Sequence, residues 1–155
     1  MDRYTEKFDY RTIETFEDAC ERLGLDPSNL PNLSTLPKRL KKPLIAFYKL
    51  MVVFESINDK WLPDYNNKNQ CKYYPLFEID PSGTGFFDCK NSSVFNNTKT
   101  NSFLCCNTQD KALYAGKQFI ELWKDYYLIN RSQPDPSQDN DPSKRNVRFR
   151  IMFHK

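Results

Sequence analysis

An apolar helical stripe between Pro43 and Asn58 constrains the fold of this chain more than any other feature. Its apolar residues recur at spacings of three and four and cover more than half of a helix circumference: Leu44, Ile45, Phe47, Tyr48, Met51, Val52, Phe54 and Ile57. Because a helix that is apolar on most sides must be covered on most sides, the pattern predicts a central helix. We expect it to begin near Lys38, with Ser34 or Thr35 as its cap, and to end near Asn58.

The same stripe is too short to cross a membrane. Its longest apolar run, residues 44–54, contains Lys49 and reaches only about half of the roughly 20 residues that a bilayer span requires. Residues 1–11 carry charges throughout, which does not fit a signal peptide. We therefore expect a soluble protein without a signal peptide.

Two further amphipathic helices are predicted, one on each side of the central helix in the sequence. The first can be capped by Thr12 or by Thr15, with Asp18 placed to complete a capping box from Thr15, and it should end at Gly24. Its apolar face consists of Ile13, Phe16, Ala19, Cys20 and Leu23. The other helix should span residues 108–129, and its small residues would let a neighbouring element approach closely: Ala112, Ala115 and Gly116.

The middle of the chain predicts a small antiparallel sheet. Tyr73, Leu76, Phe77 and Ile79 precede the turn signal of residues 81–85, and Phe86 and Phe87 follow it. Residues 103–106 supply a third candidate strand. The predicted fold is a single α+β domain over residues 1–131, with about three helices packed on a small, mainly antiparallel sheet.

The C-terminal part of the chain has a different pattern. Residues 132–146 read as a flexible linker, because they are rich in proline and aspartate and carry no aliphatic side chain. Residues 147–155 predict a terminal β-strand, in which Val147, Phe149, Ile151 and Phe153 alternate with polar or longer residues. This strand must pair with the sheet of its own chain or with another molecule.

The composition argues against most enzyme chemistries. The chain has one histidine, His154, and no spacing singles out a pair of carboxylates. The five cysteines lack CxxC spacing and read as reduced thiols; a zinc site formed by Cys71, Cys89 and the 105–106 pair is the less favoured alternative. We therefore expect no catalysis, no cofactor and no metal.

Aromatic and basic residues gather in two places that are candidates for ligand binding. Flat rings can stack on bases and lysines can contact phosphates, so the first candidate set is Trp61, Tyr65, Lys72, Tyr73 and Tyr74. The second is a basic run where the positive end of the central helix dipole lies: Lys38, Arg39, Lys41 and Lys42. Structural explanations are open for both, since the rings can form the core and the charges can simply be solvated.

The terminal segment is a third candidate for ligand contact. The last 12 residues carry five positive charges and no negative one, while the net charge of the whole chain is +3. Arg148 and Arg150 would share one face of the predicted strand, where they could contact nucleic acid. A strand that buries its apolar face and solvates its arginines would explain the same alternation.

Four segments resemble a recurring family of small proteins encoded by phages and prophages of Bacteroidota gut bacteria. They are IETFEDAC (13–20), WLPDY (61–65), KYYPLF (72–77) and ALYAGKQF (112–119), and the resemblance covers roughly residues 12–129. It implies viral origin and the cytoplasm of a bacterial host. It transfers no catalytic or binding residue.

These observations favour a non-enzymatic phage accessory protein that binds nucleic acid or a nucleotide through aromatic and basic residues. One alternative is a protein-interaction or virion-assembly component that uses its terminal strand on a second copy or on another phage or host protein. Another is an inhibitor or sponge of host nucleotide-based defence signalling, which would need an enclosed pocket. None of these functions requires a membrane.

Overall fold

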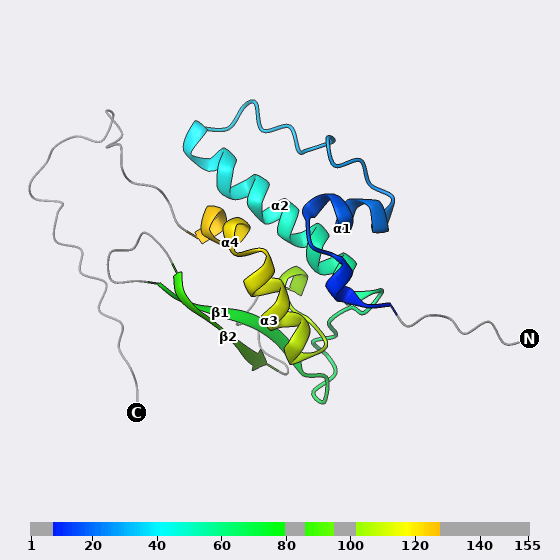
Figure 1. Ribbon diagram of the computed structural model, residues 1–155. Helices are drawn as coiled ribbons and strands as arrows, with labels where there is room; N and C mark the ends of the chain where they lie inside the picture. The colour runs from blue at the N-terminus through cyan, green and yellow to red at the C-terminus, as the bar shows by residue number, and fades with distance from the viewer. Residues whose placement is uncertain (1–7, 80–85, 95–101, 128–155) are drawn as a thin grey trace, which may run out of the picture.

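The computed structural model of the protein describes residues 8–79, 86–94 and 102–127 (Figure 1). The linker and the terminal strand predicted for residues 132–155, including Arg148 and Arg150, lie outside these residues. Within them the chain has mixed helix and strand content, as expected for an α+β fold. Its elements are η1 (Tyr10–Thr12), α1 (Phe16–Leu23), α2 (Lys38–Asn58), β1 (Lys72–Ile79), β2 (Phe86–Val94), η2 (Ser102–Leu104), α3 (Gln109–Gln118) and α4 (Ile120–Tyr127).

Local signals set both ends of α1 as predicted. The Thr15 side chain accepts a hydrogen bond from the Asp18 backbone amide, and the Asp18 carboxylate accepts one from the Thr15 amide. This capping box lowers the pKa of Asp18, chiefly through its side-chain hydrogen bond with Thr15. The helix ends at Gly24, which adopts φ +68°, a left-handed conformation that costs glycine little.

The central helix α2 extends over 21 residues and ends at Asn58, as the apolar stripe predicts. The expected caps are wrong. The N-cap position is Pro37, and no side chain there forms a capping hydrogen bond. Pro37 fits this position because its φ of −54° is already near the helical value, and its carbonyl accepts a hydrogen bond from the Leu40 amide at 2.9 Å.

The third predicted helix is divided into α3 and α4. The break is at Phe119, whose φ of −104° and ψ of 31° leave the helical region. The indole Nε1 of Trp123 donates to the Ala115 carbonyl at 3.2 Å, across the break. The buried Trp123 ring contacts the rings of Phe54 and Phe77. The Trp123 ring is therefore buried between α2 and β1, and its hydrogen bond joins the two helices that the break separates.

The two strands pair antiparallel over Lys72–Ile79 and Phe86–Val94, with an irregularity between Glu78 and Ile79. The third predicted strand, residues 103–106, is wrong. Residues 102–104 form η2, and only Cys106 forms an isolated antiparallel bridge, to Tyr73. Leu104, Cys105 and Cys106 are all buried, which the alternating faces of a strand exposed on one side would not allow.

The elements form three layers, as Figure 1 shows. α1 packs on α2, α4 also packs on α2, and α3 contacts both strands of the hairpin. The core lies where these layers meet, with contributions from every helix. Its largest fully buried side chains include Trp123, Phe54, Leu50 and Ile57.

Candidate functional site

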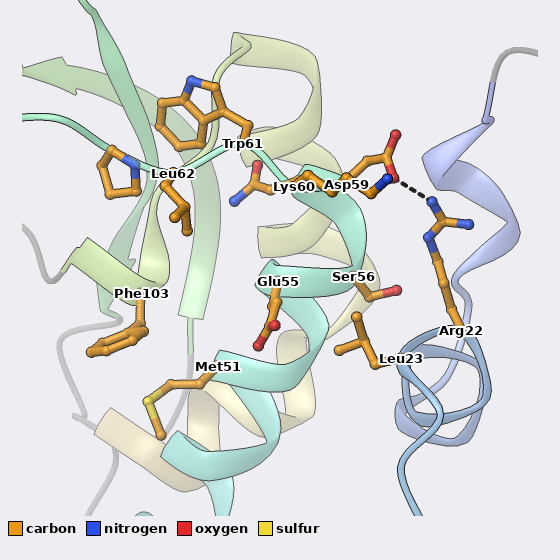
Figure 2. Close-up of a pocket in the computed structure, with 12 residues that line it drawn as sticks. Arg22, Leu23, Met51, Glu55, Ser56, Asp59, Lys60, Trp61, Leu62 and Phe103 are labelled. Carbon is orange, nitrogen blue, oxygen red and sulfur yellow. Dashed lines mark hydrogen bonds and ion pairs between the residues drawn. The ribbon is translucent and has the colours of Figure 1, made fainter.

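A pocket of about 630 Å³ lies at the C-terminal end of α2, where α1, the loop after α2 and η2 come together (Figure 2). Its volume is within the range of small-molecule sites, which is roughly 300 to 1,000 Å³. The lining residues come from three separate segments of the chain: Arg22, Leu23, Met51, Glu55, Ser56, Asn58, Asp59, Lys60, Trp61, Leu62, Pro63 and Phe103.

Apolar side chains on one side of this pocket face solvent. Leu62 is 75% exposed and Phe103 is 61% exposed, although both are large and apolar. Trp61 and Met51 line the pocket beside them and are partly exposed. Figure 2 shows Glu55 on the same side of α2 as Met51 and Phe103, while Ser56 extends toward Leu23 and Arg22. Apolar groups concentrated around a hollow are typical of a binding site.

Two polar side chains are buried in the wall of the pocket. Ser56 is completely buried and Asn58 is 7% exposed. The Asn58 amide nitrogen donates to the Cys105 carbonyl at 2.8 Å. The Asn58 Oδ1 and the Ser56 Oγ have no hydrogen-bond partner in the described ranges of the chain. Burying such an atom without a partner costs about 1 to 3 kcal/mol, so a polar group that reached either atom would stabilise it.

The charges around the pocket balance. Arg22 donates from Nη2 to Asp59 Oδ1 at 2.6 Å, and its guanidinium lies 3.4 Å from the centroid of the Phe8 ring. Lys60 and Glu55 add one charge of each sign, and both are exposed. The pocket therefore lacks the excess of positive charge that a nucleic-acid backbone would require.

The chain leaves α2 through two consecutive residues in the left-handed region. Asp59 has φ 47° and Lys60 has φ 65°. Non-glycine residues adopt this conformation at a cost of about 1 kcal/mol or more. The turn directs residues 61–63 into the wall of the pocket. The backbone strain at this turn therefore lowers the stability of the fold while it shapes the pocket.

We expect Lys60→Gly to raise the free energy of unfolding by about 0.5 to 1 kcal/mol, because glycine tolerates φ 65° without the steric cost of a Cβ. Urea denaturation measures the effect. Lys68→Gly is the control, since Lys68 is also exposed but has no positive φ, and this variant should be neutral or slightly destabilised. A destabilised Lys60→Gly protein would contradict the assignment of strain to this turn.

Lys72 was expected to contact a ligand, and the structure instead buries it completely. Its Nζ donates to the backbone carbonyls of Asp64 at 2.5 Å and Gln70 at 2.8 Å, and it lies 5.1 Å from the centroid of the Tyr65 ring. In this position the ammonium group cannot reach a phosphate at the surface. Lys72 holds the loop after α2, and the first residues of that loop form part of the pocket.

The tyrosines of the first candidate set also serve the fold. Tyr73 packs against the core and exchanges two backbone hydrogen bonds with Cys106, at 2.9 and 2.7 Å. Burial raises the pKa of Tyr65, and the neighbouring Cys105 adds to this shift. Tyr74 is partly exposed on β1 and does not line the pocket. Of the five predicted residues in this set, the pocket includes Trp61.

The predicted basic run lies at the opposite end of α2 from the pocket. A helix of 21 residues is about 30 Å long at 1.5 Å per residue. Lys42 forms an ion pair with Asp125 at 2.7 Å, and Lys41 donates to the Ser34 carbonyl at 3.3 Å. Lys38 and Arg39 are exposed. The structure therefore does not bring the two predicted halves of a nucleic-acid site together.

The buried cysteines have the properties of structural thiols. Burial raises the pKa of Cys105 to about 11, and burial also raises the pKa values of Cys20 and Cys106. Thiols with raised pKa values stay protonated and unreactive near neutral pH. In the ranges that the structure describes, no three potential metal ligands lie close enough together to hold an ion.

Sequence reasoning missed most of the pocket. The sequence predicts a strand at Phe103, and the candidate ligand residues do not include Leu62. Ser56 and Asn58 gave a usable signal, because they are polar residues at the end of an otherwise apolar helix. Their position in a buried part of α2 is the feature that could have indicated a site.

No family model, curated protein or solved structure matches this chain. Among the described residues, no helix combines the length and the apolar character that crossing a bilayer demands.

Proposed function

We propose that this protein is a non-enzymatic binding protein that holds the base of a nucleotide in the pocket at the end of α2. One observation carries the proposal: Trp61 and Phe103 line the same pocket as two buried polar atoms without a hydrogen-bond partner in the described chain. A nucleobase has flat apolar faces that stack on aromatic rings, and its edge carries hydrogen-bond donors and acceptors. One ligand of this kind would satisfy both features of the pocket.

The buried polar atoms restrict which hydrogen-bonding groups the edge of the base can carry. The Asn58 Nδ2 donates to the Cys105 carbonyl, and the Asn58 Oδ1, as an amide oxygen, can only accept a hydrogen bond from the ligand. The Ser56 hydroxyl can donate or accept, and Glu55 adds a carboxylate acceptor at the rim. The pocket therefore favours a base with an amino group, such as adenine, guanine or cytosine.

The balanced charges favour a small ligand over a long nucleic acid. Arg22 and Lys60 are the cations of the pocket, and Asp59 already engages Arg22. A single phosphate could lie near Lys60, whereas a longer backbone would pass the carboxylates of Glu55 and Asp59. We therefore propose a mononucleotide or one unpaired base as the ligand. The phage origin and the host-cell setting implied by the resemblance are part of this proposal.

A second candidate function is binding to a protein partner, and the exposure of Leu62 and Phe103 favours it. Large apolar side chains with this exposure are common at protein interfaces. A partner would cover Leu62 and Phe103 without needing the buried atoms of Ser56 and Asn58. The two functions can therefore be separated by substitutions in the wall of the pocket.

Calorimetric titration of the full chain with AMP, CMP, GMP and UMP tests the proposal. We expect binding of nucleotides with an amino-bearing base, and the nucleotides should be recovered unchanged. Trp61→Ala should weaken this binding roughly 5- to 150-fold, because stacking contributes about 1 to 3 kcal/mol per base. Lys38→Ala is the control at the far end of α2 and should leave the affinity unchanged.

Ser56→Ala distinguishes the two candidate functions. It removes a buried hydroxyl that has no partner in the described chain, so the ligand-free protein should keep or gain stability, by up to about 1 kcal/mol. Its nucleotide affinity should nevertheless fall. Absence of binding for all four nucleotides, or equal affinities of the Trp61→Ala and unsubstituted proteins, would contradict the proposal and leave the protein partner as the explanation.

A further inference from the structure

One face of α2 carries a carboxylate and an amide side chain into the wall of the pocket. Met51, Glu55 and Asn58 follow one another at spacings of four and three, which places them on the same face of the helix. All three line the pocket. Figure 2 shows Glu55 on the side of α2 where Met51 and Phe103 lie. A carboxylate therefore stands beside apolar side chains at the rim of the pocket.

The Glu55 carboxylate is available to a ligand. Its side chain is exposed, and within the part of the chain that the structure describes no cation forms an ion pair with it. Arg22, which lines the same pocket, instead donates to Asp59 at 2.6 Å. An ionised carboxylate has two acceptor oxygens and no donor. A neutral group that binds to Glu55 must therefore supply the hydrogen-bond donors.

Asn58 extends this preference by one helical turn. Its side chain is 7% exposed, and its Oδ1 has no hydrogen-bond partner among the described residues. Its Nδ2 donates to the Cys105 carbonyl at 2.8 Å, which fixes the orientation of the amide. An amide oxygen can only accept a hydrogen bond. The Glu55 carboxylate and the Asn58 Oδ1 therefore both require donors from a ligand.

Among the common bases, guanine has the edge that matches these acceptors. Its N1–H lies beside the N2 amino group, so it can donate two parallel hydrogen bonds to one carboxylate and keep a second amino hydrogen for another acceptor. In adenine and cytosine a ring nitrogen acceptor lies beside the amino group and would face the carboxylate unfavourably. In uracil the N–H lies between two carbonyl groups. A pair of adjacent donors is therefore specific to guanine.

We propose that the pocket selects guanine nucleotides and that Glu55 is the residue that determines this specificity. The proposal rests on the proposed nucleotide-binding function. The Glu55 carboxylate accepts from N1–H and from the N2 amino group, and the Asn58 Oδ1 accepts the second amino hydrogen. The rings of Trp61 and Phe103 supply apolar surface for the faces of the base. The sugar and the phosphate extend from the five-membered ring, away from the edge that binds Glu55.

Titration of the full chain with GMP, IMP and AMP tests this specificity. IMP keeps the N1–H but lacks the N2 amino group, whereas AMP has an acceptor at N1. A bidentate hydrogen-bonded pair discriminates between bases by roughly 5- to 150-fold, so we expect GMP to bind more tightly than AMP by a factor in this range. The affinity for IMP should lie between the other two.

Glu55→Gln separates the role of this carboxylate from general binding. Glutamine presents one acceptor and one donor, an arrangement that can pair with adenine, so the ratio of GMP to AMP affinity should fall about tenfold. Because Glu55 is exposed, the variant should fold normally, which circular dichroism checks. Glu17→Gln is the matched control. It removes the same charge from an exposed position of α1 that does not line the pocket, and it should leave the ratio unchanged.

Two results would overturn the selection of guanine while nucleotide binding itself stands. One is equal affinity of the unsubstituted protein for GMP and AMP. The other is a ratio of GMP to AMP affinity that Glu55→Gln leaves unchanged. A protein that binds none of these nucleotides would overturn both this proposal and the proposed function, so the two failures are distinguishable.

Discussion

Replacing Lys72 with alanine should lower the free energy of unfolding by roughly 3 to 5 kcal/mol. The ammonium group donates to carbonyls of the loop after α2, at 2.5 Å from Asp64 O and 2.8 Å from Gln70 O. Hydrogen bonds to a charged group contribute about 1.5 to 3 kcal/mol each, and the variant leaves these carbonyls without the donor. The loss of the buried aliphatic stem adds to this effect.

Lys68→Ala is the matched control for this measurement. Lys68 belongs to the same loop and is exposed, so its loss should change stability by no more than about 0.5 kcal/mol. Urea denaturation followed by circular dichroism gives both values. A Lys72→Ala protein as stable as Lys68→Ala, but with weakened nucleotide binding, would show that Lys72 contacts the ligand after all.

Replacing Trp123 with alanine should be as damaging, at roughly 3 to 5 kcal/mol. The ring is 2% exposed and packs against rings of α2, β1 and its own helix: Phe54 at 5.9 Å, Phe77 at 5.0 Å and Tyr126 at 6.2 Å between centroids. Its removal would leave a cavity between α2, α4 and β1. The hairpin would then lose much of its attachment to the helices.

Trp123→Phe separates the ring from its hydrogen bond. Phenylalanine keeps most of the apolar contact but cannot donate to the Ala115 carbonyl, so we expect a smaller loss of about 1 to 2 kcal/mol. Thermal unfolding of the two variants gives the comparison. Equal losses for alanine and phenylalanine would show that the indole N–H, and not packing, dominates the contribution of this residue.

The sequence is a sufficient guide where a structure depends on neighbours in the chain. The capping box of Thr15 and Asp18, the stop at Gly24 and the end of α2 at Asn58 follow from residues within one or two helical turns. The cap at Thr108 is of the same kind, since its side chain accepts from the Lys111 amide. These interactions form within any chain that carries the same local residues.

The failures occur where distant segments compete for the same residue. Phe103 and its neighbours fit a strand pattern. In the structure Leu104, Cys105 and Cys106 are buried, and the segment forms η2 followed by a single bridge at Cys106. A similar conflict divides the helix at Phe119 and brings the Trp123 indole to Ala115. A pattern of apolar residues does not say which of two competing contacts will form.

The sequence by itself determined the amphipathic helices, the caps at Thr15 and Thr108 and the central place of α2, because periodicity and capping act over a few residues. Only the tertiary structure decided which candidate ligand residues are buried and how far apart they lie. It buried Lys72 under loop carbonyls, and it separated the basic run at Lys38 from Trp61 by the length of α2. The pocket depends on contacts such as that between Asn58 and Cys105, 47 residues apart, and a burial pattern of this range exists only once the chain has folded.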